Sequence, residues 1–324
     1  MHVSERVGGV AVRWARVGLF YGIALGGAVI VALVIWVLRR TIGDAAVLVG
    51  TAVTALLYMP LPMVAGLIVE RVAGRRPLIV AEWRSLRTGF WRTYGRNAVT
   101  AVVLIMAILV LAAAVAWSSG VLGIPGAGHL VTSDAELNER LSQVSGGLAL
   151  GTAALSVGAV AATGIVQGIA AGLTINGLFA FGEEYGWRGV LADELRPLGR
   201  FRAPLLTGVL WGLWHAPIIM LGHNYGSEWR WGVFVMVAWT VPFSFVLTWA
   251  RERTGSVLAP AMLHGAANGA LGMFVYLVIG GNALIALPVG LLMAITLTVL
   301  AIVIWHLPRP AGGTPSRRGF SDAR

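Results

Sequence analysis

The sequence predicts an all-α fold, a polytopic membrane helix bundle of about eight transmembrane helices. Three observations predict it. Of the 324 residues, 57% are hydrophobic and only 12% are charged, whereas soluble domains carry about 25% charged residues. The mean hydropathy is +0.80. Apolar runs long enough to cross a bilayer recur along the whole chain.

A helix needs about 20 mostly apolar residues to cross about 30 Å of hydrocarbon. As one straight helix the fourth apolar run would be roughly 50 Å long, so we expect it to be tilted, broken near its glycines, or preceded by a separate short helix. The eight predicted spans are residues 17–38, 45–69, 98–117, 147–181, 203–221, 231–250, 256–278 and 283–305.

The placement of the arginines predicts the orientation. All 24 basic residues are arginines. With the N-terminus in the cytoplasm, twenty of them fall in cytoplasmic segments and four in outer loops, which is the bias that orients membrane proteins. Both termini are then cytoplasmic, and the loop with Asp134, Glu136 and Glu139 lies outside. Because the arginines lie in short loops between spans, the net charge of +10 predicts no nucleic-acid partner.

Residues 77–97 predict a basic, aromatic-rich amphipathic helix. Such a helix lies flat on the inner leaflet of a membrane; a solvated cytoplasmic loop is the alternative. Its large apolar residues at roughly helical spacing are Trp83, Leu86, Phe90, Trp91 and Tyr94, and its arginines are Arg84, Arg87, Arg92 and Arg96.

Glu183 and Glu184 stand side by side at the end of the fourth apolar run. A charge inside a bilayer costs from about 3 to over 10 kcal/mol, so such residues generally serve a site or a partner. Arg188 follows Glu184 by four residues, which puts the two on one helical face as an ion pair. Glu183 is rotated by about 100° and points elsewhere. The alternative is a helix end whose charges merely reach the headgroups.

Two further apolar runs carry polar side chains. His215 lies near mid-depth of the fifth run, with Trp211 one turn before it. A lone histidine there is more often a hydrogen-bonded packing residue than a catalyst. In the seventh run His264 and Asn268 share a face, and the small residues between them let a neighbouring helix come close. Taken alone, that pair is also consistent with hydrogen bonding between helices.

Unsatisfied polar groups in hydrocarbon each cost several kcal/mol, so we expect Glu183, the two histidines and Asn268 to converge on one another or on a water-filled cavity. The set suits hydrolysis. A desolvated carboxylate with a neutral imidazole can draw a proton from water that attacks a peptide carbonyl. A second imidazole and an amide can donate hydrogen bonds to the developing oxyanion.

Other protease chemistries are less compatible with the sequence. No aspartate falls within a predicted span, the His-Glu-x-x-His zinc motif is absent, and Ser118 and Ser119 lack a nucleophile context. The absence of cysteine excludes thiolate nucleophiles and Cys-based metal sites. Two histidines and a glutamate could hold a catalytic zinc ion, which stays open, but we expect no metal and no cofactor.

At these residues the chain resembles the CAAX-protease and bacteriocin-processing family (CPBP, or Abi family), which are membrane glutamate proteases that include the type II CAAX prenyl endopeptidases. The resemblance covers about residues 147–278. Three motifs carry it in order: Glu-Glu-x-x-x-Arg, Phe-x-x-x-His and His-x-x-x-Asn. They appear here as Glu183, Glu184 and Arg188, as Trp211 and His215, and as His264 and Asn268. We expect the replacement of Phe by Trp211 to affect an aromatic wall more than the chemistry.

The resemblance implies that Glu183 with His215 activates water, that His264 with Asn268 forms the oxyanion site, that Glu184, Arg188 and Trp211 support them, and that no cofactor is required. It also implies a helical fold with a cavity open to the cytoplasm or inner leaflet. The predicted regions are an N-terminal transmembrane region over residues 1–146, a catalytic core over 147–282, and a last span with a disordered cytoplasmic tail over 283–324.

The function expected is that of a metal-independent intramembrane endopeptidase in a bacterial inner membrane. Its partners are the lipid bilayer and a peptide or protein substrate in or at the membrane. Two alternatives stay open. One is a non-catalytic immunity or regulatory protein that binds a peptide or partner in the same cavity. The other is a transporter, whose polar residues would trace a path across the whole bilayer.

Overall fold

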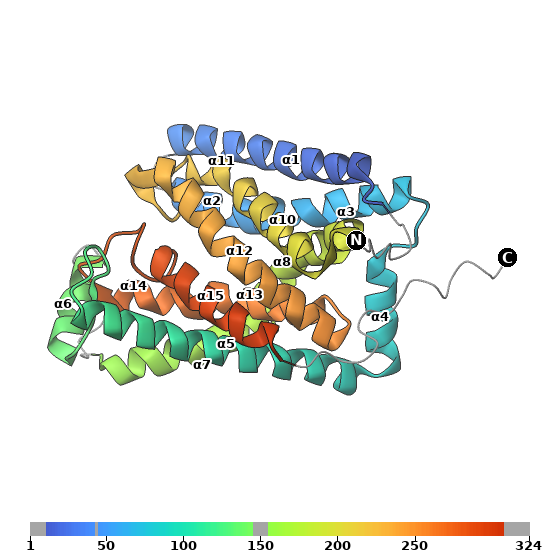
Figure 1. The fold of residues 1–324 in the computed structure, drawn as a ribbon. Helices are drawn as coiled ribbons and strands as arrows, with labels where there is room; N and C mark the ends of the chain where they lie inside the picture. Colours follow the sequence, from blue (N-terminus) through green and yellow to red (C-terminus); the bar gives the residue numbers. More distant parts are fainter. Residues whose placement is uncertain (1–10, 43–44, 145–154, 308–324) are drawn as a thin grey trace, which may run out of the picture.

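About 81% of the computed structural model is helical, and the model describes residues 11–42, 45–144 and 155–307 (Figure 1). The predicted all-α membrane bundle is confirmed. The tail predicted to be disordered, from residue 308 onward, lies outside the described residues. Two short strands, β1 (His129–Leu130) and β2 (Val278–Ile279), pair antiparallel.

The helices of the bundle differ widely in length. The α-helices are α1 (Trp14–Thr41), α2 (Ala45–Val53), α3 (Leu61–Val72), α4 (Leu78–Thr88), α5 (Phe90–Val121), α6 (Asp134–Val144), α7 (Val157–Leu173), α8 (Ile175–Glu184), α9 (Ala192–Leu195), α10 (Gly199–Trp214), α11 (Ala216–Ile219), α12 (Trp229–Thr254), α13 (Leu258–Ala270), α14 (Phe274–Leu277) and α15 (Leu291–Trp305). Two π-helical segments, η1 (Thr54–Tyr58) and η2 (Tyr185–Leu191), and three 3₁₀ turns, η3 (Arg196–Leu198), η4 (Gly226–Glu228) and η5 (Leu271–Met273), complete the helical structure.

Five helical runs in the described part of the chain are long and apolar enough to cross a membrane, so the chain is a multi-pass membrane protein. A sixth is added if the bent pair of α7 and the run Ile175–Ile219 counts as one span. Helix α15 has 15 residues, fewer than the roughly 20 that a straight span needs. The count of eight spans therefore stays a prediction. The five runs are Trp14–Thr41, Leu48–Val72, Phe90–Val121, Gly226–Thr254 and Leu258–Leu277.

The start of α1 and the end of α15 lie at the same end of the bundle. Arg16 pairs with Glu194 across 3.7 Å, and Arg200, six residues further along the chain, donates a hydrogen bond to the carbonyl of Trp305. Helix α4 runs across this end in Figure 1. We call it the arginine-rich end, because most arginines of the described residues lie there. Its predicted cytoplasmic location is consistent with the positive-inside rule.

The single amphipathic helix predicted over residues 77–97 is wrong in its extent. The backbone of Gly89 is not helical, and it separates α4 from α5, which continues into the bundle. The inner face of α4 is held by a buried carboxylate: Glu82 accepts hydrogen bonds from Ser256 Oγ at 2.5 Å and from Val257 N at 3.0 Å. Burial raises the pKa of Glu82. The opposite face leaves Trp83 63% exposed, and its contact with the inner leaflet stays a prediction.

Helix α13, which carries His264, is packed backbone to backbone against its neighbours. A β-carbon added at Gly265 would lie 2.5 Å from the backbone nitrogen of Gly177 in α8. One added at Gly172 in α7 would lie 2.4 Å from the nitrogen of Ala266. The close approach predicted for the small residues around His264 is therefore present. It brings His264 of α13 within contact distance of Glu184 at the end of α8.

We expect Gly265→Ala to lower the midpoint of thermal unfolding of the detergent-purified protein. The added methyl group overlaps backbone atoms that cannot rotate away, and overpacking of this kind costs about 1–3 kcal/mol. The matched control is Gly158→Ala in α7, because a β-carbon at Gly158 meets nothing within 4 Å. Alanine there is favoured in a helix by up to about 1 kcal/mol, so its midpoint should be unchanged or higher. Equal midpoints for the two variants would contradict the packing argument.

Candidate active site

A break in the fourth apolar run brings the two glutamates to the centre of the bundle. α7 and the helical run that starts at Ile175 are bent by 56° relative to each other, which is one of the three courses predicted for this run. Helix α8 ends at Glu184, and all seven residues of the π-helix η2 that follow it are buried. π-helical turns are rare and often lie at functional sites. Here the π-helix carries Arg188.

Glu184 contacts both Arg188 and His264. Its Oε1 atom lies 3.2 Å from Arg188 Nη1 and 2.9 Å from His264 Nδ1. The ion pair predicted from the i, i+4 spacing is confirmed, and the contact with His264 joins η2 to α13. Glu184 and Arg188 are fully buried, and His264 is only 4% exposed.

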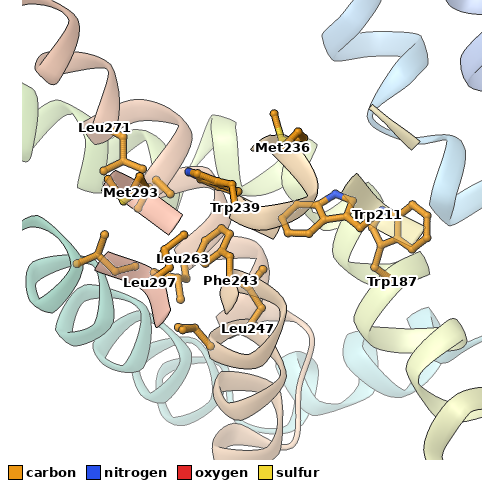
Figure 2. Packing of buried hydrophobic residues seen from close by; sticks show 14 of the residues in the cluster. Trp187, Trp211, Met236, Trp239, Phe243, Leu247, Leu263, Leu271, Met293 and Leu297 are labelled. Carbon is orange, nitrogen blue, oxygen red and sulfur yellow. The ribbon is translucent and has the colours of Figure 1, made fainter. Parts of the chain in front are cut away.

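Arg188 is also held by an aromatic ring. Its guanidinium carbon lies 4.1 Å from the centroid of the Trp211 ring, a cation–π arrangement that is worth about 2 kcal/mol or more when it is desolvated. The ring of His264 lies 5.3 Å from the same indole, edge to face. Figure 2 shows Trp211 between Trp187 and Trp239 in the buried aromatic layer.

Glu183, the second carboxylate, is 3% exposed and accepts a hydrogen bond from Trp211 Nε1 at 2.9 Å. The expectation that Trp211 affects an aromatic wall more than the chemistry stays a prediction, but the indole also binds the Glu183 carboxylate. Phenylalanine has no N–H group, whereas the indole N–H holds the Glu183 carboxylate in place. A hydrogen bond to an ionised group is about twice as strong as a neutral one, so this contact restricts the rotamer of the proposed base.

His215 lies where α10 ends, and Pro217 follows inside the first turn of α11. Its Nδ1 atom lies 2.8 Å from the carbonyl oxygen of Trp211. Because a carbonyl only accepts, Nδ1 carries the proton and Nε2 is left with a lone pair. No hydrogen bond between His215 and Glu183 is found in the described structure. The two are connected through Trp211, which contacts Glu183 with its indole and His215 with its carbonyl.

The same reasoning assigns the protons of His264. A carboxylate paired with Arg188 accepts, so His264 donates from Nδ1 to Glu184. A protonated His264 would then donate from Nε2 as well. In that state the buried cluster of Glu183, Glu184, Arg188 and His264 carries two negative and two positive charges. Such a balance lowers the cost of burying charged groups.

Asn268 departs from the expected convergence. It lies one turn from His264 along α13, but its side chain is exposed, and no hydrogen bond joins it to the cluster in the described structure. His264 is buried and Asn268 is exposed, so the two predicted oxyanion donors do not lie in the same environment. The role of Asn268 stays a prediction.

Sequence reasoning missed the residues that hold the segment before His215. Tyr58, at the end of η1, donates a hydrogen bond to the carbonyl of Trp214 at 2.5 Å, and its ring lies 4.3 Å from the Trp214 ring. Trp214 Nε1 in turn donates to the carbonyl of Ala24 in α1. A tyrosine inside the second apolar run was the available signal, because a phenolic hydroxyl at that depth requires an acceptor.

The four residues of the cluster are buried. They are at most 4% exposed, and His215 is half-buried. The cavity open to the cytoplasm or inner leaflet stays a prediction. Within residues 11–42, 45–144 and 155–307, no three His, Asp or Glu side chains are grouped to hold a metal ion. The carboxyl and imidazole groups of the site can transfer protons, and the imidazoles can donate hydrogen bonds.

Comparisons with known proteins point to one family. A family model described as type II CAAX prenyl endopeptidase Rce1-like matches residues 165–270, which include every predicted site residue. CAAX prenyl protease 2 of the archaeon Methanococcus maripaludis is 32% identical over 88 residues, which cover 24% of this chain and 31% of that protein. The match thus spans about a third of the relative. Residues 165–270 of this chain are thus similar to the CAAX protease family.

Proposed function

We propose that this protein is an intramembrane endopeptidase that hydrolyses a peptide bond in a membrane-associated or hydrophobic peptide. One observation carries the proposal: the buried cluster of Glu183, Glu184, Arg188 and His264 lies inside the segment that matches the CAAX protease family model. Charges in a membrane protein are costly and generally functional. The location proposed is a bacterial inner membrane.

In this mechanism Glu183 together with His215 takes a proton from water as its oxygen bonds to the peptide carbonyl carbon. The proton is then given to the amine nitrogen, which leaves when the C–N bond breaks. Trp211 orients both groups, because its indole N–H binds the Glu183 carboxylate and its carbonyl accepts from His215 Nδ1. The lone pair on His215 Nε2 is then available as a base. General base catalysis by positioned groups of this kind contributes roughly 10²–10⁴-fold to a rate.

His264 is proposed to stabilise the oxyanion. Glu184 accepts from Nδ1 of its imidazole and forms an ion pair with its charged form, so Nε2 is free to donate to the substrate oxygen. Arg188 holds Glu184 in this position. Asn268 is proposed as the second donor. Its exposed amide, one turn along α13, would contact a substrate that approaches from that side.

The experiment that tests the function compares the membrane peptides of cells carrying the parent protein with those of cells carrying Glu183→Gln. If the protein is a protease, we expect peptides with new termini in the parent cells and their uncut precursors in the variant cells. Identical peptide sets at equal protein levels would contradict the proposal.

The buried site is also compatible with one alternative, a non-catalytic immunity or regulatory protein that binds a peptide or partner in the same cavity. The cluster is at most 4% exposed, so the site has to open before a peptide can reach it, whether that peptide is cleaved or only bound. In this case Glu183→Gln should leave both the bound partner and the cellular peptides unchanged.

A further inference from the structure

Two hydroxyl groups in α12 differ from the other helical hydroxyls. Serine and threonine inside a helix commonly donate to the carbonyl four residues earlier, and Thr240 and Thr254 of this helix do so at 2.9 and 3.0 Å. The buried hydroxyls of Ser244 and Thr248 have no hydrogen-bond partner among the described residues. A buried hydroxyl without a partner costs about 1–3 kcal/mol, so these two groups require an explanation.

The two residues are four apart, so they lie on one face of α12, about 6 Å apart along its axis. Thr248 lines a cavity of about 10 Å³ between α10, α12 and α15, together with Arg200 and Trp305. That volume is about the smallest that holds one water molecule. Arg200 is exposed at the arginine-rich end, which places the cavity at the surface of the bundle.

Ser244 continues this line toward the site. A β-carbon added at Gly208 of α10 would lie 3.1 Å from the β-carbon of Ser244, and Gly208 is three residues before Trp211. The neighbour of Ser244 in the chain, Phe243, has its ring 6.0 Å from the Trp211 ring. Ser244 is fully buried, and Phe243 beside it also has its ring 6.2 Å from the His264 ring of the cluster.

The cluster itself contains further polar atoms without a partner. Arg188 Nε and Nη2 and Glu184 Oε2 are buried and make no hydrogen bond with a described residue. An unsatisfied guanidinium nitrogen in a low-dielectric interior is especially costly. Donors and acceptors thus recur from the surface cavity at Thr248, past Ser244, to the charged site.

We propose that ordered water molecules bind along α12 between Thr248 and Ser244 and connect the arginine-rich end of the bundle with the buried site. Each water molecule would accept from or donate to one of these unpaired groups, as buried waters in proteins generally do. Water binding is supported by the set of polar atoms without a partner, and it does not depend on the proposed function. The idea that this water also reaches the site for hydrolysis rests on the proposed function, because hydrolysis at a buried site consumes water.

The test uses the indole N–H of Trp211, which donates to Glu183 and reports on water at the site. Its exchange in D₂O is followed by NMR in lipid nanodiscs, with Trp211→Phe to identify its signal. In Ser244→Ala/Thr248→Val we expect exchange roughly tenfold slower than in the parent, because the two hydroxyl groups that bind water are lost. Unchanged exchange would overturn the proposal.

Two controls separate the water route from general loosening. Thr296→Val removes a buried threonine hydroxyl that is already bonded to the carbonyl of Leu292, and it should leave the exchange of Trp211 unchanged. The indole N–H of Trp214, bonded to Ala24 in another part of the core, should exchange equally in all variants. Because exchange is measured without a substrate, slower exchange in a protein that cleaves nothing would support the water route and count only against the proposed hydrolysis.

Discussion

Glu183→Gln is expected to lower the rate of peptide cleavage by roughly 10²–10⁴-fold, the usual contribution of a general base. A glutamine amide cannot take a proton from water. Its oxygen can still accept the hydrogen bond that Trp211 Nε1 donates to Glu183, so the fold should persist. The measurement is kcat of the purified parent and variant on a peptide identified in the cellular comparison, with the midpoint of thermal unfolding as a check on folding.

The matched control is Glu70→Gln, because Glu70 is another fully buried glutamate that is not part of the cluster. It accepts hydrogen bonds from Tyr185 Oη at 2.5 Å and from Leu78 N at 3.0 Å. Cleavage per folded molecule should stay close to that of the parent. If the Glu183→Gln protein cleaved as fast as the parent, the hydrolase proposal would be wrong.

Dialysis of the parent protein against a strong chelator should leave cleavage unchanged. Complete loss of cleavage that is restored by zinc would show that a metal is required.

Arg188→Met is expected to lower the free energy of unfolding by about 3–5 kcal/mol, the cost of removing one partner from a buried ion pair. Arg188 is fully buried, lies 3.2 Å from Glu184 Oε1 and stacks over Trp211. Methionine fills much of the volume but leaves the Glu184 carboxylate with His264 as its remaining cation. Denaturant titration in mixed micelles measures the change.

A second substitution distinguishes loss of charge balance from loss of packing. The double variant Arg188→Met/Glu184→Gln also lacks the carboxylate that Arg188 paired with, so we expect part of the lost stability to return. Arg188→Lys keeps the charge but lacks the planar group that stacks on Trp211, and its stability should fall between those of the parent and Arg188→Met. A double variant no more stable than Arg188→Met would show that the ion pair is not the cause.

Local sequence patterns predicted part of the site correctly. The four-residue spacing of Glu184 and Arg188 predicted their ion pair because residues at i and i+4 are neighbours on any helix. The small residues around His264 predicted the close packing of α13. The same kind of argument was wrong for residues 77–97, where α4 ends before Gly89 and α5 begins directly after it. It was also insufficient for Asn268, since sharing a face with His264 does not determine how deeply that face is buried.

The sequence by itself determined the class of the molecule, a multi-pass helical membrane protein, and the set of polar groups that such a protein has to accommodate. Which of these groups touch was decided only by the tertiary structure. The bend at Thr174, the π-helix of Tyr185–Leu191 and the glycine contacts of α13 set where the helices meet. As a result His264 contacts Glu184, and Glu183 accepts a hydrogen bond from the indole of Trp211. Contacts between helices depend on such bends and crossings, whereas residue spacing describes only one helix at a time.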